Sequence, residues 1–286
     1  MNPPGVVVPP VTLPDAVGLP ELPELPATPD SPVHGAILFA RYAYPPNELG
    51  YCGPPDNRAL FEYGATQTVD RGLLQIAQGF NGAWPYLEFI SRATGVESPL
   101  DRRVVEGYWL GGPLLDRIDM KTFGNALFDR FRKSTGTKGW GFLAEAIPEG
   151  AVPDHNFHVF GVYPWVGLLK TGRASTPLEH LDKCRIRWGQ VVSVEGDQVT
   201  VLSRPLTYDG KDLGLGERRL ETVRASVDGV AFLDAFRPGE WVSMHWNWVC
   251  DRLSRRQLHL LRRSLQRQLD ITNHRVAHPG PRAVIG

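Results

Sequence analysis

Residues 182–201 read DKCRIRWGQVVSVEGDQVTV. The cysteine of this stretch, Cys184, stands five residues before Gly189, and a run of β-branched residues follows the glycine. The later tetrapeptide EGDQ has the composition of a hairpin turn, so the stretch predicts two antiparallel strands. Cys184 then precedes the first strand, where it is either an ordinary buried thiol or a ligand at the mouth of a small β-barrel.

The same pattern of short strands continues toward the C-terminus. RRLETVRASVDGVAFL repeats it with a turn at Asp228-Gly229, and RPGEWVSMHWNWVCDRLS contains a turn followed by another strand. The final segment SRRQLHLLRRSLQRQLDITN is amphipathic, and its leucines form one helical stripe at 258, 261, 265 and 269. Residues 178–273 therefore predict four or five short strands closed into an OB-like β-barrel, followed by a helix.

The stretch EWVSMHWNWV alternates as a β-strand does. One face would carry Trp241, Ser243, His245, Asn247 and Val249, and the other Val242, Met244, Trp246 and Trp248. The second face is apolar and predicts core. His245 stands in the more polar row, where it is either a hydrogen-bonded surface histidine or a functional one.

The rest of the chain predicts helices and two tails. Residues 33–177 contain helical apolar periodicities and caps, which indicate a mainly helical domain, so the predicted fold class is α+β. Residues 1–32 are rich in proline and predict a disordered tail, more simply a solvated leader than a partner-binding arm. Residues 274–286 predict a second disordered tail.

Composition excludes several classes of protein. The 286 residues carry no net charge, which argues against global binding to nucleic acid or anionic membranes. The three cysteines include no C-x-x-C pair, which argues against a disulfide framework or a zinc knuckle. We find neither a signal peptide nor an apolar run long enough to span a membrane, so we expect a cytoplasmic protein.

Two further segments contain side chains that could act in binding, in catalysis or as metal ligands. RYAYPPNELGYCGPPD, residues 41–56, predicts a rigid loop and not a helix, because proline and glycine dominate it. We expect this loop to bind a partner, with Cys52 either a reactive thiolate or an inert thiol; its candidate residues are Arg41, Tyr44, Tyr51, Cys52 and Asp56. DHNFHVFG contains His155 and His158, but strand or loop structure would point them to opposite faces, and no third metal ligand is obvious nearby.

The C-terminal third, roughly residues 180–270, resembles the small OB-fold chaperones of [NiFe]-hydrogenase maturation, HypC and its relative HybG. The motifs that match are CRIRWGQVVSV, with Cys184 and Gly189, and RPGEWVSMHWNWVCDRLSRRQL, with its histidine-bearing strand and final helix. The resemblance implies that Cys184, supported by His245, binds a transient iron fragment with cyanide and carbonyl ligands. It implies as partners the hydrogenase large subunit or maturation proteins such as HypD. The chain departs from the family in having an internal cysteine, with Ile186 and Trp188 where the family has small residues.

The whole chain also resembles an uncharacterised actinobacterial family with an ARYAYPPN-LGYCGP signature, associated with hydrogenase gene neighbourhoods. We therefore expect a non-enzymatic accessory protein that binds its partners through residues that include Trp188, Arg255 and Arg262. One alternative is an OB-type protein that binds single-stranded nucleic acid through Trp188, Tyr208 and the basic final helix. Another is a thiol enzyme with Cys52 or Cys184 as nucleophile, although the sequence places no particular histidine beside either.

Overall fold

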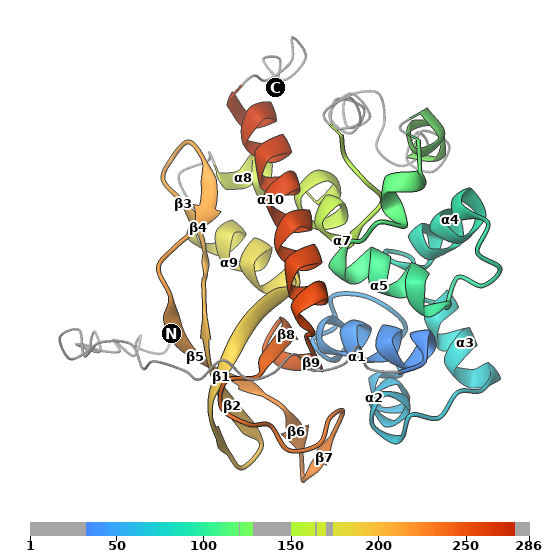
Figure 1. Ribbon diagram of the computed structural model, residues 1–286, viewed down its shortest axis with the longest axis vertical. Coiled ribbons are helices and arrows are strands. Elements are labelled where there is room, and N and C mark those ends of the chain that lie inside the picture. The colour runs from blue at the N-terminus through green and yellow to red at the C-terminus, as the bar shows by residue number, and fades with distance from the viewer. Residues whose placement is uncertain (1–32, 120, 128–149, 164, 170–173, 278–286) are drawn as a thin grey trace, which may run out of the picture.

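The structure is a computed structural model that describes residues 33–119, 121–127, 150–163, 165–169 and 174–277. It confirms the α+β class. Figure 1 shows a β-barrel on one side and a group of helices on the other, with the long helix α10 (Arg255–Ala277) running between them. Within the described residues, no helix combines the length and the apolar character needed to cross a membrane.

The helical part precedes the barrel in the chain. Its elements are α1 (Gly35–Glu48), α2 (Asn57–Thr66), α3 (Arg71–Gln78), α4 (Trp84–Thr94), α5 (Arg102–Leu110), η1 (Leu115–Arg117), α7 (His155–Phe157), η2 (His158–Val162), α8 (Trp165–Leu168) and α9 (Ser175–Cys184). Aspartates begin several of them: Asp56, Asp70 and Asp101 each accept a hydrogen bond from a backbone N–H of the first turn.

Five strands close the barrel in the order β1-β2-β5-β9-β8. Their bounds are β1 (Arg187–Glu195), β2 (Gln198–Ser203), β5 (Arg219–Arg224), β8 (Trp241–His245) and β9 (Trp248–Arg252). Two small hairpins, β3 (Leu206–Tyr208) with β4 (Leu213–Leu215) and β6 (Ser226–Val227) with β7 (Val230–Ala231), branch from it. The barrel neighbours are antiparallel except β5 and β9, which confirms the predicted OB-like barrel.

Strand β1 closes the barrel because it pairs with a neighbour on each side. Gly189 lies opposite Ser203 of β2 and opposite Val242 of β8. A Cβ atom at Gly189 would stand 2.9 Å from the side chain of Val201, so only glycine fits this crossing without a shift of its neighbours. The pairing with β2 then slips at Val191/Ser193, and such a bulge increases the local twist.

The apolar core is continuous across the predicted boundary at residue 177. Valines and Met244 fill the barrel, and a second, larger cluster extends from α1 through α5 and α9 to the final helix. The predicted leucine stripe of α10 is buried at all four positions and contributes to this cluster. Helix α10 packs on α5 and α7 as well as on the β4 hairpin, so it joins the two parts of the molecule.

The prediction that residues 41–56 form a loop is wrong for the first half of that segment. Residues 41–48 are the second half of α1, and Pro45 and Pro46 lie inside this helix. The helix forms because its residues from Gly35 to Asn47 are buried, and this packing outweighs the unfavourable intrinsic propensity of proline. The predicted disorder of 274–286 also begins too early, since α10 reaches Ala277; residues 1–32 and 278–286 lie outside the described part.

Candidate functional site: an aromatic chamber with two histidines and a cysteine in a cluster

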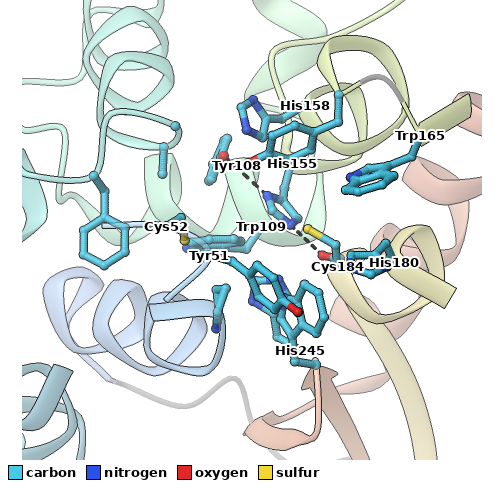
Figure 2. A pocket seen from close by; sticks show the side chains of 16 residues that line it. Tyr51, Cys52, Tyr108, Trp109, His155, His158, Trp165, His180, Cys184 and His245 are labelled. Carbon is cyan, nitrogen blue, oxygen red and sulfur yellow. Dashed lines mark hydrogen bonds between the residues drawn. The ribbon is translucent and has the colours of Figure 1, made fainter. Parts of the chain in front are cut away.

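A cavity of about 200 Å³ lies where the helical part meets one end of the barrel. Its wall is made mostly of aromatic side chains, histidines and two cysteines, as Figure 2 shows. Among the described residues that line it, none is aspartate, glutamate, lysine or arginine. The chamber is therefore apolar, apart from imidazole, thiol, phenol and indole groups.

Three of these side chains form a cluster of the kind that binds metal ions. His155 is the first residue of α7, Cys184 is the last residue of α9, and His245 is the last residue of β8. One nitrogen of each histidine and the sulfur of Cys184 all lie within 4.8 Å of one another. The residues come from places 29 and 61 positions apart in the chain, so only the fold brings them together.

The ring of His245 is held by helix α1. Its Nδ1 donates a hydrogen bond to the carbonyl oxygen of Tyr42 over 2.7 Å, which places the proton on Nδ1 and the lone pair on Nε2. That carbonyl is free within the helix because residue 46 is proline and has no N–H to donate. The Nε2 of His245 is buried and makes no hydrogen bond of normal geometry among the described residues, although the backbone carbonyl of Cys184 also acts on this ring. Burial lowers the pKa of His245 far below its usual value, so the ring is neutral.

The ring of His155 is held by the cysteine beside it. Its Nε2 donates to the carbonyl oxygen of Cys184 over 2.8 Å, and its Nδ1 is left with the lone pair. The hydroxyl of Tyr108 lies 3.4 Å from that Nδ1. Burial lowers the pKa of His155 to about 4, so this imidazole is also neutral at neutral pH.

Helix α10 fixes the position at which His155 enters the chamber. Asp154 caps α7 by accepting from the N–H of Phe157 over 2.8 Å, and Ser264 of α10 donates to the same carboxyl group over 2.5 Å. Asn156 donates to the Ser264 hydroxyl over 2.8 Å. Burial raises the pKa of Asp154 to about 6. The final helix thereby positions one of the three cluster residues.

Cys184 contributes its sulfur atom to the cluster, and its backbone carbonyl oxygen accepts the hydrogen bond from His155. Burial raises the pKa of its thiol, and the Cys52 thiol adds to this effect. At neutral pH the chain therefore presents a protonated thiol between two neutral imidazoles. A divalent cation would deprotonate such a thiol by coordination.

The cluster fits a transition metal in donor type and in surroundings. Thiolate and imidazole are the donors that suit zinc, copper and iron. One nitrogen of each histidine donates to a backbone carbonyl, and metal-binding histidines usually make an outer hydrogen bond of this kind with their second nitrogen. Zinc bonds of about 2.0–2.3 Å would place tetrahedral ligands about 3.3–3.6 Å apart. The cluster atoms therefore need to approach one another by up to about 1.2–1.5 Å.

A second thiol, that of Cys52, lines the same chamber away from the cluster. Figure 2 shows it across the cavity from Cys184. Its loop is shaped by Gly53, whose φ of +84° is a left-handed conformation and whose missing Cβ makes room for the Phe80 ring. Burial raises the pKa of Cys52 to about 12, so its thiol is protonated at neutral pH.

Aromatic side chains form the rim of the chamber. Tyr51 stacks on Trp246 with ring centroids 4.4 Å apart, and Trp165 stacks on His180 at 4.6 Å. Trp246 has a φ of +52°, which is a strained conformation for a bulky residue. Two hydrogen bonds hold it there: the backbone N–H of Trp246 donates to the carbonyl of Lys183 over 2.8 Å, and Arg187 donates to the backbone carbonyl of Trp246. Strain of this kind is concentrated at functional sites.

Comparison with known protein families places the chain in one of them. A family model described as "Family of unknown function (DUF6390)" matches residues 31–279. The chain belongs to this family. No curated protein and no solved structure matches it. The matched region includes the whole helical part, the barrel and α10, and therefore every residue of the chamber.

In this DUF6390 protein the two predicted metal residues, Cys184 and His245, lie together. The third member of the cluster, His155, was expected on a strand or loop without a metal partner. It begins a helical segment, α7 followed by η2, and its partners come from other parts of the chain. The H-x-x-H spacing was the available signal, but the second histidine, His158, lies outside the cluster.

The predicted partner-binding residues are spread over different environments. Arg41 and Tyr44 are buried in α1, where Arg41 forms an ion pair with Asp251 at 3.2 Å and Tyr44 donates to Glu48 over 2.8 Å. Both side chains are therefore buried in a helix and do not lie on the partner-binding loop that we expected. Tyr51 and Cys52 belong to the chamber. Asp56 is exposed and caps α2.

Of the other three predicted partner-binding residues, Trp188 is in β1, and Arg255 and Arg262 are in α10. Trp188 is buried, and the guanidinium of Arg262 lies over its ring at 5.7 Å. Arg255 is exposed in the first turn of α10. That these residues bind a partner stays a prediction.

Proposed function

We propose that this protein binds a transition-metal centre through His155, Cys184 and His245. The observation that carries the proposal is the buried cluster itself: one nitrogen of His155, one nitrogen of His245 and the Cys184 sulfur lie within 4.8 Å of one another, and the buried Nε2 of His245 makes no hydrogen bond of normal geometry among the described residues. A buried nitrogen without a hydrogen bond is costly, and a metal ion gives its lone pair a partner. Carbonyl groups already fix both imidazole rings for that role.

We further propose that the metal is cargo in the assembly of another protein. The resemblance of the C-terminal third to the [NiFe]-hydrogenase maturation chaperones supports an iron fragment with cyanide and carbonyl ligands as that cargo. The hydrogenase large subunit or HypD would then be the partner. In that family the cysteine is the first residue of the mature chain and also offers a free amine. Cys184 is internal, so the two histidines would supply nitrogen donors in place of that amine.

The thiol-enzyme alternative has one observation in its favour, since Cys184 stands beside two histidines. A nucleophilic cysteine needs a lowered thiol pKa and a cation or a base beside it. Here burial raises the pKa of Cys184 and lowers the pKa of both imidazoles. His155 also uses its proton on the Cys184 carbonyl and not on the thiol. This arrangement favours metal binding over nucleophilic catalysis.

The first experiment is a titration of the metal-free protein with Co²⁺ under reducing conditions. Binding through Cys184 predicts a thiolate-to-cobalt charge-transfer band that saturates at one ion per chain and is lost in Cys184→Ser. Thermal unfolding of the variant checks that its fold is retained. Absence of the band in the wild-type protein would show that the cluster binds no metal through sulfur.

The second experiment tests the role in assembly. The protein is purified anaerobically from cells that express hydrogenase genes, and its infrared spectrum is recorded in the cyanide and carbonyl region. We expect bands that are absent from Cys184→Ala, together with a co-purified hydrogenase subunit or HypD. If neither the bands nor such a partner is found, the role in hydrogenase assembly is rejected. Metal binding itself is then decided by the cobalt titration.

A further inference from the structure

The three side chains of the cluster leave one side of a bound metal facing the chamber. They come from α7, α9 and β8, and Figure 2 shows all three among the residues around the cavity. Three protein ligands and one open position are the arrangement of metal sites that take an exogenous ligand. What the open position accepts depends on the charges and hydrogen-bond donors around it.

Charge counting favours an anion. A divalent ion bound by one thiolate and two neutral imidazoles keeps one net positive charge. The described residues that line the chamber include no carboxylate to balance that charge. Around Cys184 in the chain, Lys183 and Arg187 pair with Glu221 at 3.6 and 2.5 Å, and Arg185 pairs with Asp182 at 2.7 Å. Three cations thus face two carboxylates, so the surroundings add positive charge. An unbalanced charge in an apolar site is costly.

Two buried hydrogen-bond donors on rings that line the chamber also favour an anion. The indole N–H groups of Trp109 and Trp246 are buried and have no partner among the described residues, and both rings line the cavity. The Trp109 ring lies 4.7 Å from the ring of His155 and 5.7 Å from that of His245, measured between centroids. Trp246 follows His245 directly in the chain. An anion beside the metal gives such donors an acceptor.

We infer that a metal held by His155, Cys184 and His245 takes its fourth ligand from the aromatic chamber, and that this ligand is a small monoanion. The inference rests on the proposed binding of a metal ion by these three side chains, and not on the iron fragment as cargo, and it adds the class of the fourth ligand. The cavity of about 200 Å³ admits an ion of a few atoms together with several waters. The aromatic rim around Tyr51 and Trp246 restricts larger ions.

The competing occupant is a second thiolate from the chain itself. Cys52 lines the same chamber and would neutralise the metal equally well, but its sulfur is not part of the close cluster. The two possibilities differ in the number of sulfur atoms bound to the metal. They also differ in whether an added anion finds an open position.

The test uses the cobalt-loaded full-length protein and two probes of similar shape, azide and acetonitrile. Each is a linear group of three heavy atoms, but only azide is charged. We expect azide to shift the visible cobalt bands in a saturable way, with an apparent affinity at least about tenfold above that of acetonitrile. X-ray absorption should count one sulfur per cobalt. Equal response to both probes, no response to azide, or two sulfurs that become one in Cys52→Ser would overturn the inference.

A matched pair of variants tests the donors. Trp246→Phe keeps an aromatic ring at the rim and removes the N–H, and Trp188→Phe makes the same change outside the chamber. Loss of one hydrogen bond to an anion corresponds to about a tenfold or larger loss of azide affinity. We expect that loss in Trp246→Phe and not in Trp188→Phe, both measured after full cobalt loading. An unchanged azide affinity in Trp246→Phe would contradict a role for this donor. Absence of the thiolate-to-cobalt band in the wild-type protein would instead reject metal binding itself.

Discussion

The Nδ1 of His245 lies 2.7 Å from the carbonyl oxygen of Tyr42, although the two residues are about two hundred positions apart in the chain. In an ordinary helix the N–H of residue 46 would bond to this oxygen. Proline at position 46 leaves the oxygen free, and the histidine of β8 uses it. A proline that is unfavourable for the helix thus sets the tautomer of a candidate metal ligand.

Pro46→Ala tests this relationship. The new N–H would compete with His245 for the Tyr42 carbonyl, so the imidazole would lose part of its orientation. We expect cobalt affinity to fall by about tenfold, within the range observed when outer-sphere partners of metal ligands are changed. The free energy of unfolding should stay the same or rise, because alanine is the better helix former.

Pro45→Ala is the matched control for Pro46→Ala. It makes the same change one residue earlier, where the freed carbonyl is that of Arg41 and not the partner of His245. Its cobalt affinity should equal that of the wild-type protein. A similar loss of affinity in both variants would show that a general change in α1, and not the Tyr42 carbonyl, is responsible.

His155 and His158 form a second matched pair. Both line the chamber, but only His155 belongs to the three-atom cluster. Removing one of three metal ligands should weaken cobalt binding by at least about a hundredfold, whereas His158→Ala should change it by less than about threefold. Competition with a chromogenic chelator measures both affinities. Equal losses in the two variants would remove His155 from its assigned role.

The alternation of β8 was readable from sequence, but the end of the strand and the burial of its polar face were not. The predicted single strand turns at Trp246 and Asn247 into β9, and Val249 lies in the barrel core and not on the face of His245. Val242 and Met244 face the barrel core as the period of two predicts. Ser243 and His245 lie on the opposite face, and that face is buried as well, because α1 packs on it and the Tyr42 hydroxyl bonds to Ser243 at 2.7 Å. A strand pattern shows which residues share a face and does not show whether another element covers that face.

The barrel was predicted from local turn chemistry, since the turns at Gly196-Asp197 and Asp228-Gly229 are where the sequence predicted them. Two other features depend on tertiary packing and were not predicted. The cluster is one of them, because His155 and Cys184 are joined through a carbonyl hydrogen bond that no local pattern indicates. Helix α1 likewise contradicts its own proline content, because burial stabilises it.

Arg41→Ala distinguishes a buried structural arginine from a surface residue. The guanidinium of Arg41 is buried and forms an ion pair with Asp251 at 3.2 Å. The substitution removes this guanidinium and leaves the buried carboxylate of Asp251 without its ion-pair partner. Burial already raises the pKa of Asp251 to about 6, although Arg41 opposes the rise. We expect a loss of about 3–5 kcal/mol in the free energy of unfolding, measured by urea denaturation at pH 7.

The control for Arg41→Ala is Arg58→Ala, in which an exposed arginine that pairs with Glu62 is removed. Its cost should stay below about 1 kcal/mol, because exposed ion pairs contribute little. If Arg41→Ala were as mild as this control, the Arg41–Asp251 pair would not contribute to stability.

Glu221 gives the fold a dependence on acid pH. Burial alone would raise its pKa, but the charge of Arg187, a hydrogen bond from Ser203 and the charge of Lys183 outweigh burial and lower the pKa to about 2. A carboxyl whose pKa is lower in the folded state stabilises the fold above its unfolded pKa. This contribution is complete above about pH 4.5 and is lost as the pH falls toward about 2.

Glu221→Gln should remove that part of the acid dependence. At pH 7 we expect a loss of about 2–3 kcal/mol in the free energy of unfolding, because Arg187 loses its charged partner while the amide oxygen still accepts a hydrogen bond. The difference between variant and wild type should shrink as the pH is lowered from 5 to 3. Glu217→Gln, at an exposed carboxylate, should show neither effect. If the Glu221→Gln deficit were the same at both pH values, Glu221 would act through packing and not through its charge.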